Sequence, residues 1–142
     1  MDRRKKNNYD RIEPMPRKLF LELMREFKES GGKYIASEQS EAFLDSQGAE
    51  ASAINATTIL FRRRPSRAAV YEELFHVCQF RDGKIKGTVK NSIECEIEAK
   101  EYLLSNADRL QLTQSEIQKT REDLEWYKIQ LREQKGEEND GM

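Results

Sequence analysis

The sequence predicts an α+β domain in which about five helices pack against a small antiparallel sheet. Two observations indicate this fold class. Several segments repeat apolar residues at helical spacing, and one of them predicts a long C-terminal helix. Between the helical segments, residues 57–61 (TTILF) are dense in β-branched and aromatic side chains, which favour strands. The 142 residues fit one domain, residues 14–133, between a basic disordered tail (1–13) and an acidic disordered tail (134–142).

The first predicted helix begins at Pro16, which suits a first helical turn, and ends at Gly31-Gly32. Its apolar residues are Leu19, Phe20, Leu23, Met24 and Phe27. A short strand is predicted over 33–36. Ser37 then favours an N-cap for a second short helix, residues 38–47, which Gly48 stops.

Residues 51–63 predict a hairpin of two strands with a turn at Asn55-Ala56. Pro65 interrupts this run, and Ser66 favours the start of a helix over residues 67–80. A further helix is predicted from about residue 92 to 104. The pair Thr113 and Glu116 is a capping-box signature for the final helix, residues 114–133.

Composition restricts the classes of function. The net charge of −1 argues against bulk electrostatic attraction to nucleic acid. No segment is apolar enough to span a membrane, and the N-terminus lacks the apolar run of a signal peptide, so cytoplasmic residence is expected. Cys78 and Cys95 match no zinc-finger spacing and are expected to be reduced, buried thiols.

The helix over residues 67–80 carries the most informative pattern. On a helical wheel its apolar residues cover about two thirds of the circumference, which predicts a largely buried helix. The remaining stripe contains two carboxylates, the only histidine of the chain and a carboxamide, in Glu72, Glu73, His76 and Gln79. Because buried charges are costly unless they are paired or bind a metal, this stripe indicates a metal site.

Helical geometry assigns roles within this stripe. Glu72 and His76, four residues apart, lie on one side of the helix and can reach one ion. Glu73 falls where the related H-E-x-x-H motif has its general base. Carboxylate and imidazole are competent ligands for Zn²⁺, and also for Mn²⁺ or Fe²⁺.

A further ligand is expected from the helix over residues 92–104. Glu96 lies inside the apolar face of this helix, where an acid is unusual unless it has a partner. It is interpreted either as a metal ligand or as the partner of an arginine. Glu98 is the alternative ligand, because a small change of helical phase would turn it inward.

Taken together, TILFRRRPSRAAVYEE (58–73), LFHVCQFRDGKI (74–85) and EIEAKEYLL (96–104) resemble a known family. They are similar to the zincin-like metallopeptidase toxin domains of bacterial polymorphic toxins and related phage-borne proteins. These domains combine a strand, a P-[ST]-R connection, an H-E-x-x-H or E-E-x-x-H helix ending in Q-[FY]-x-x-G, and an E-x-E-A helix. The resemblance covers roughly residues 17 to 130.

The resemblance implies a zincin-like active-site helix with one divalent metal ion, most readily Zn²⁺. It places Glu72 and His76 at two ligand positions, Glu73 at the general-base position, and Glu96 or Glu98 at the downstream ligand position. Independently of these positions, Gln79, Arg62, Arg64 and Arg67 are the candidate substrate-binding residues. A carboxylate at position 72, where the commoner motif has imidazole, shifts preference toward harder metals such as Mn²⁺ or Fe²⁺. The implied substrate is a peptide or protein, and a cognate inhibitor protein is an expected partner.

Three functions follow from these patterns. The first is a metal-dependent peptidase or amidase. The second is a Mg²⁺- or Mn²⁺-dependent phosphodiesterase acting on nucleic acid, whose arginines grip phosphate; the candidates are Arg62, Arg63, Arg64 and Arg67. The third is a catalytically degenerate zincin-like module whose final helix, with Trp126, docks a partner or packs on its own domain.

Overall fold

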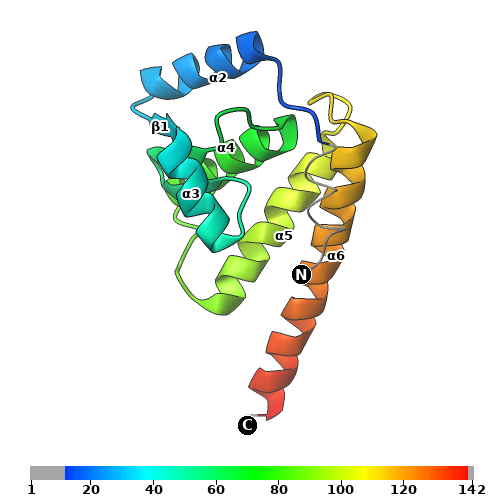
Figure 1. Ribbon diagram of the computed structural model, residues 1–142. Helices are drawn as coiled ribbons and strands as arrows, with labels where there is room; N and C mark the ends of the chain where they lie inside the picture. The colour runs from blue at the N-terminus through cyan, green and yellow to red at the C-terminus, as the bar shows by residue number, and fades with distance from the viewer. Residues whose placement is uncertain (1–11, 141–142) are drawn as a thin grey trace.

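The computed structural model describes residues 12–140, which form five helices and one three-stranded sheet. The elements are α2 (Arg17–Glu29), β1 (Lys33–Ala36), α3 (Glu38–Gln47), β2 (Ser52–Asn55), β3 (Thr58–Phe61), α4 (Arg67–Arg81), α5 (Val89–Ser105) and α6 (Gln114–Asp140). In Figure 1, α2, α3 and the sheet lie to one side of α4, and the long pair α5 and α6 lies to the other. The predicted α+β class is confirmed.

The sheet is mixed, with β3 at its centre between β1 and β2. β2 and β3 form the predicted antiparallel hairpin, in which Ala53 lies opposite Ile59. β1 pairs with β3 in parallel, with Tyr34 opposite Ile59. The prediction of an antiparallel sheet is therefore wrong for β1. The chain changes direction twice between β1 and β3, through α3 and through the hairpin turn, so these two strands run the same way.

The main core lies between α2, the sheet and α4. The helical spacing read from the sequence places Phe20, Met24 and Phe27 of α2 inside this core. They pack with Ile59 and Phe61 of β3 and with apolar residues of α4. Burial of large aromatic and aliphatic side chains contributes about 1.5–3 kcal/mol each, so this cluster holds α4 firmly against the sheet.

Side-chain caps fix where α4 and α6 begin. The Ser66 hydroxyl accepts a hydrogen bond from the Ala69 amide at 3.1 Å, as the sequence predicts for an N-cap. The Thr113 hydroxyl accepts from the Glu116 amide, and the Glu116 carboxylate accepts from the Thr113 amide at 3.0 Å, which confirms the predicted capping box. The same carboxylate also accepts from the Ala68 amide at 2.7 Å, so one buried acid caps α4 and α6 together.

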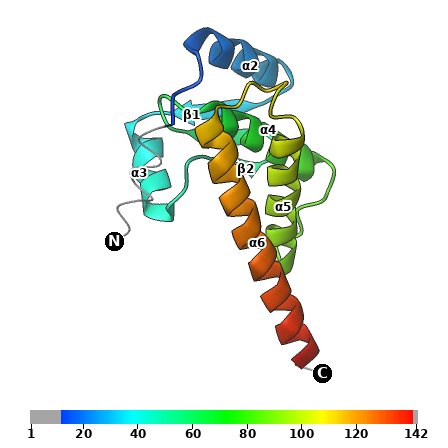
Figure 2. The same ribbon diagram turned by 90° about the vertical axis from the view of Figure 1, so that its right-hand side faces the viewer.

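α5 and α6 lie side by side in opposite directions, and in both views the C-terminal part of α6 extends beyond α5 (Figures 1 and 2). α5 begins at Val89, earlier than the predicted residue 92, because the Thr88 hydroxyl caps it by accepting from the Asn91 amide at 3.1 Å. α6 continues to Asp140, beyond the predicted end at residue 133. Most of the predicted basic tail, residues 1–11, lies outside the described residues.

Within residues 12–140, no helix is both long and apolar enough to cross a lipid bilayer.

Candidate metal centre

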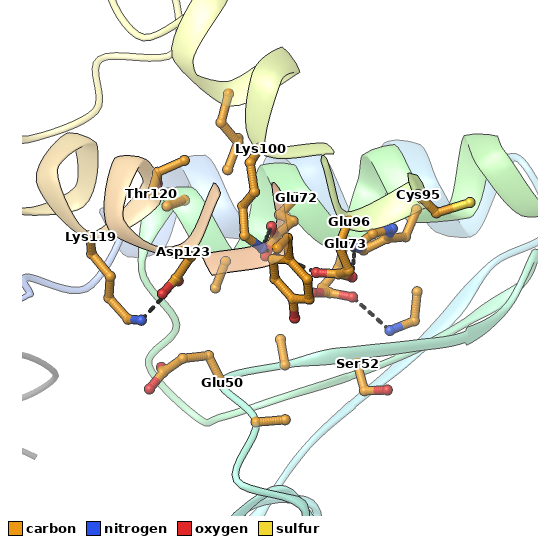
Figure 3. Close-up of a pocket in the computed structure, with 18 of the residues that line it drawn as sticks. Glu50, Ser52, Glu72, Glu73, Cys95, Glu96, Lys100, Lys119, Thr120 and Asp123 are labelled. Atoms are coloured by element: carbon orange, nitrogen blue, oxygen red, sulfur yellow. Dashed lines mark hydrogen bonds and ion pairs between the residues drawn. The ribbon is translucent and has the colours of Figure 1, made fainter. Parts of the chain in front are cut away.

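A pocket of about 820 Å³ opens between α4, α5, α6 and the segment that leads into β2. Glu72, Glu73 and His76 line it from α4, and Glu96 and Lys100 line it from α5. In Figure 3 the labelled side chains of Glu72, Glu73, Glu96 and Lys100 point toward one another at the centre of this pocket. The sequence predicts that acids from both helices meet the histidine. Of the five residues named here, all except Lys100 are predicted site residues.

Three of the four residues in the polar stripe of α4 are buried, as their surroundings on the helical wheel predict, and Glu72 is half-buried. Glu73, His76 and Gln79 are 6%, 8% and 1% exposed. Glu72, Glu73 and His76 each offer a ligand atom, and these atoms lie within 4.8 Å of one another. Cys78 lies on the exposed side of the same helix, so the prediction of two buried thiols holds only for Cys95.

The two ring nitrogens of His76 have different partners. Nδ1 lies 2.7 Å from Oε1 of Gln79. The amide nitrogen of Gln79 donates to the Cys95 carbonyl at 3.0 Å and to the Glu98 carboxylate at 3.1 Å. Both of those groups are acceptors, so the Gln79 oxygen must face the imidazole and His76 Nδ1 must be the donor. The other nitrogen, Nε2, faces the pocket and lies 2.8 Å from Glu96 Oε1.

Glu73 links α4 to the sheet. Its Oε1 accepts a hydrogen bond from the Ala53 amide of β2 at 2.8 Å. Burial, reinforced by the negative charge of Glu72, raises the pKa of Glu73 to about 7. A carboxyl group that titrates near neutrality is suited to accept and return a proton at physiological pH.

A lysine that the sequence analysis did not select completes the cluster. Lys100 is 6% exposed, and its ammonium group forms ion pairs with Glu72 and, at 3.2 Å, with Glu96. It also lies 5.5 Å from the centre of the Tyr127 ring of α6, a cation–π distance. Glu72 is therefore held by an ammonium group, although the sequence predicts it only as a metal ligand.

Charge pairing dominates the titration of these groups. Burial raises the pKa of Glu96, but the His76 hydrogen bond and the Lys100 charge outweigh this and hold it at about 2. Burial opposes the charged form of His76, yet the Glu96 hydrogen bond and the Glu73 charge raise its pKa to about 9. Burial likewise opposes the charge of Lys100, but Glu72 and Glu96 raise its pKa above the ordinary range. Pairing with these acids thus favours the charged forms of both His76 and Lys100.

Comparison of the chain with protein-family models, curated proteins and solved structures gives no match. The resemblance to zincin-like toxin domains therefore has support only from the site itself. At that level the structure shows a Glu72, Glu73 and His76 group on one helix, with the composition of a metal site.

Glu98, the alternative ligand, does not join this group. Its carboxylate accepts from the Gln79 amide at 3.1 Å and pairs with Lys84 at 3.3 Å, on the outer side of Gln79. Of the two candidate acids on α5, it is Glu96 that meets His76. The helical phase read from the sequence, which places Glu96 inside the apolar face, gives the correct orientation.

Gln79, predicted to lie near the substrate, is a buried support of His76 and does not line the pocket. Its amide oxygen and nitrogen are both used within the protein. A glutamine between a histidine and a neighbouring helix fixes the ring orientation, which is the usual task of the groups behind metal ligands.

The predicted phosphate-binding arginines also lie outside the pocket. Arg62 pairs with Asp45 at 2.9 Å and donates to the Ala49 carbonyl, and Arg63 pairs with Glu41 at 2.8 Å. Arg64 is exposed and Arg67 is half-buried at the start of α4. The first two hold the ends of α3 and β3 together, a structural use that a run of arginines does not reveal in sequence.

Lys100 and Tyr127 are the residues of the cluster that sequence reasoning missed. One signal for Lys100 was present, because it follows Glu96 by four residues and therefore shares its helix face. Tyr127 comes from α6, and only the packing of α6 against α5 brings it to the site. Burial raises the pKa of Tyr127 to about 12, so it stays a neutral phenol.

The donor set fits a divalent ion. The imidazole has one nitrogen fixed as a donor to Gln79 and the other directed at carboxylates, and carboxylates from two helices surround it. His76 Nε2 would have to lose its proton to bind a metal, and Glu72 would have to release Lys100.

Proposed function

We propose that this chain is a metal-dependent hydrolase of peptide or amide bonds, with a zincin-like site derived from a bacterial toxin domain. One observation carries the proposal: His76 donates from Nδ1 to a buried glutamine and directs Nε2 at carboxylates that line an 820 Å³ pocket. Histidines that bind catalytic metals are oriented in this way, with the second nitrogen donating to a fixed acceptor. A histidine that only packs in the core would not require three acids, Glu72, Glu73 and Glu96, beside it, because buried carboxylates are costly.

His76 and Glu72 are the ligands supplied by α4, and Glu96 is the ligand supplied by α5. A divalent ion bound there would polarise the scissile carbonyl and acidify a water molecule. Carboxylates outnumber the imidazole in this set, which favours Mn²⁺ or Fe²⁺ beside Zn²⁺.

Glu73 is the proposed general base. It lies next to the ligand positions, it is buried, and its pKa of about 7 lets it take a proton from water at neutral pH. The hydrogen bond from the Ala53 amide fixes one of its oxygens, so that the other is available toward the pocket. The substrate would be a peptide or protein, and a cognate inhibitor protein is the partner expected of a toxin-derived chain.

One observation favours a second candidate, a catalytically inactive zincin-like module. Lys100 already neutralises two of the carboxylates that a metal would need. The phosphodiesterase alternative has less support, because none of its four arginines lines the pocket among the described residues.

Metal content and cleavage test the proposal together. The full chain is dialysed against each of Zn²⁺, Mn²⁺ and Fe²⁺, and bound metal is measured by elemental analysis, with proteolysis of unfolded casein as the activity assay. We expect one ion per chain, lost in His76→Ala. Glu73→Gln should retain the ion but cleave about 10²–10⁴-fold more slowly.

Glu94→Gln is the matched control, since Glu94 is an exposed acid on α5 outside the pocket. It should change neither readout. No stoichiometric ion in the wild-type chain, or full activity in Glu73→Gln, would refute the hydrolase proposal. Stoichiometric metal without any cleavage would select the inactive module.

A further inference from the structure

The Lys100 ammonium lies among the carboxylates that the proposed function assigns to a metal ion. It contacts Glu72 of α4 and Glu96 of α5, and its side chain is 8% exposed. Figure 3 shows Lys100 reaching down from α5 to Glu72, with Glu96 and Glu73 beside them. Lysine is among the residues least often buried, and it is buried only where its charge is paired.

These contacts explain how the acids coexist without a metal ion. Glu72, Glu73 and Glu96 bring up to three negative charges into one partly buried space, where these charges would repel one another without compensation. The Lys100 ammonium supplies a positive charge at hydrogen-bond distance from both Glu72 and Glu96, and His76 Nε2 lies 2.8 Å from Glu96. The protein therefore contains its own cation for the site, attached through a flexible four-carbon stem.

A divalent ion and this ammonium cannot use the same carboxylates together. Both are cations that seek the lone pairs of Glu72 and Glu96, and their mutual repulsion at such short range is strong in a buried site. Lys100 has room to move, because it lines the pocket, and the acids Glu122 and Asp123 of α6 line the same pocket.

We propose that Lys100 and a divalent metal ion are alternative occupants of the space between Glu72 and Glu96, so that Lys100 sets the metal affinity of the site. This inference rests on the proposed metal centre. Lys100 is then a positioning residue. Its ammonium group holds Glu72 and Glu96 in place when no metal is bound, and a metal ion binds only when the ammonium group leaves these two carboxylates.

Calorimetric titration of the full chain with Zn²⁺ tests the exchange. Lys100→Met removes the competing charge, and its Kd for zinc should fall by about tenfold or more, within the usual range of coupling between two competing occupants. Lys84→Met is the matched control. It removes the same charge from a lysine that pairs with Glu98, outside the cluster, and its zinc affinity should equal that of the wild type.

A purely structural lysine gives a different result. In that case Lys100→Met would lower Tm without tightening zinc binding. Under the exchange, the metal-free variant also melts at a lower temperature, because its acids lose their cation, but zinc raises its Tm by more than it raises that of the wild type.

A second measurement on the wild-type chain covers the case in which Lys100→Met does not fold. Amine acylation followed by mass spectrometry reports how accessible each lysine is, with and without zinc. Zinc should speed the labelling of Lys100 and leave exposed Lys84 unchanged. Zinc binding with equal affinity in the wild type and Lys100→Met, or unchanged Lys100 labelling, would overturn the exchange while the metal centre stands. If neither protein binds Zn²⁺, Mn²⁺ or Fe²⁺, the proposed function fails as well.

Discussion

Replacing Gln79 with leucine tests the claim that this buried amide orients His76. The substitution keeps the volume of the side chain approximately and removes its three hydrogen bonds, to His76 Nδ1, to the Cys95 carbonyl and to Glu98. Glu98 is partly exposed and can turn to water, and the Cys95 carbonyl belongs to a helix. The loss therefore falls mainly on the His76 N–H, which is left buried without an acceptor.

The magnitude follows from that one group. A buried donor left without a partner costs about 1–3 kcal/mol. For a domain of this size the corresponding fall in Tm is roughly 4–12 °C. Loss of the group behind a metal-binding histidine also weakens metal affinity, typically by about 10- to 100-fold.

Thermal unfolding of the metal-free protein and zinc titration measure the two effects separately. Gln79→Glu is the informative companion, because a carboxylate still accepts from His76 Nδ1 but cannot donate to Cys95. It should retain more of the zinc affinity than Gln79→Leu does. If Gln79→Leu binds zinc as tightly as the wild type, Gln79 does not position the imidazole, and the assignment of Nε2 as the ligand atom loses its basis.

Two further predictions concern stability. Glu116→Gln should lower the free energy of unfolding, measured in urea, by roughly 2–4 kcal/mol, because only the oxygen of an amide can accept a hydrogen bond and both Ala68 and Thr113 donate one here. Glu122→Gln, at an exposed position of α6, serves as the control. Equal losses of stability in the two variants would contradict the shared cap. The metal-free protein should also lose stability as pH rises. The pKa of His76 is raised from 6.5 to about 9, so its contribution to stability is present below pH 6.5 and is lost toward pH 9. The pKa of Glu73 is raised from 4.5 to about 7, so stability also falls between pH 4.5 and pH 7. A Tm that increases from pH 5 to 9 in the presence of a chelator would show that these sites do not control stability.

Local patterns predicted most of the helices and their starts. The spacing of Phe20, Met24 and Phe27 depends only on the 3.6-residue period, and the Ser66 cap and the Thr113 and Glu116 box depend on neighbours within four residues. The same holds for the buried polar residues of α4, because the apolar residues that cover about two thirds of that helix all lie within one segment of the sequence. Such features can be read from one segment at a time.

Features that depend on distant segments were missed or misjudged. The direction of β1 relative to β3 is decided by the path of the chain between them, which strand composition does not encode. Lys100 could be placed on the face of Glu96, but its meeting with Glu72 depends on how α5 crosses α4. The longer α6 was missed because residues after 133 are polar and lack an apolar period.

The double cap made by Glu116 couples the helix that carries His76 to α6. Glu116 closes the first turn of α4 as well as that of α6, and α6 also delivers Tyr127 to Lys100. A chain cut after residue 112 would therefore keep every proposed ligand and the packing of α4 on the sheet, but it would lose the Glu116 cap of α4 and the Tyr127 ring beside Lys100.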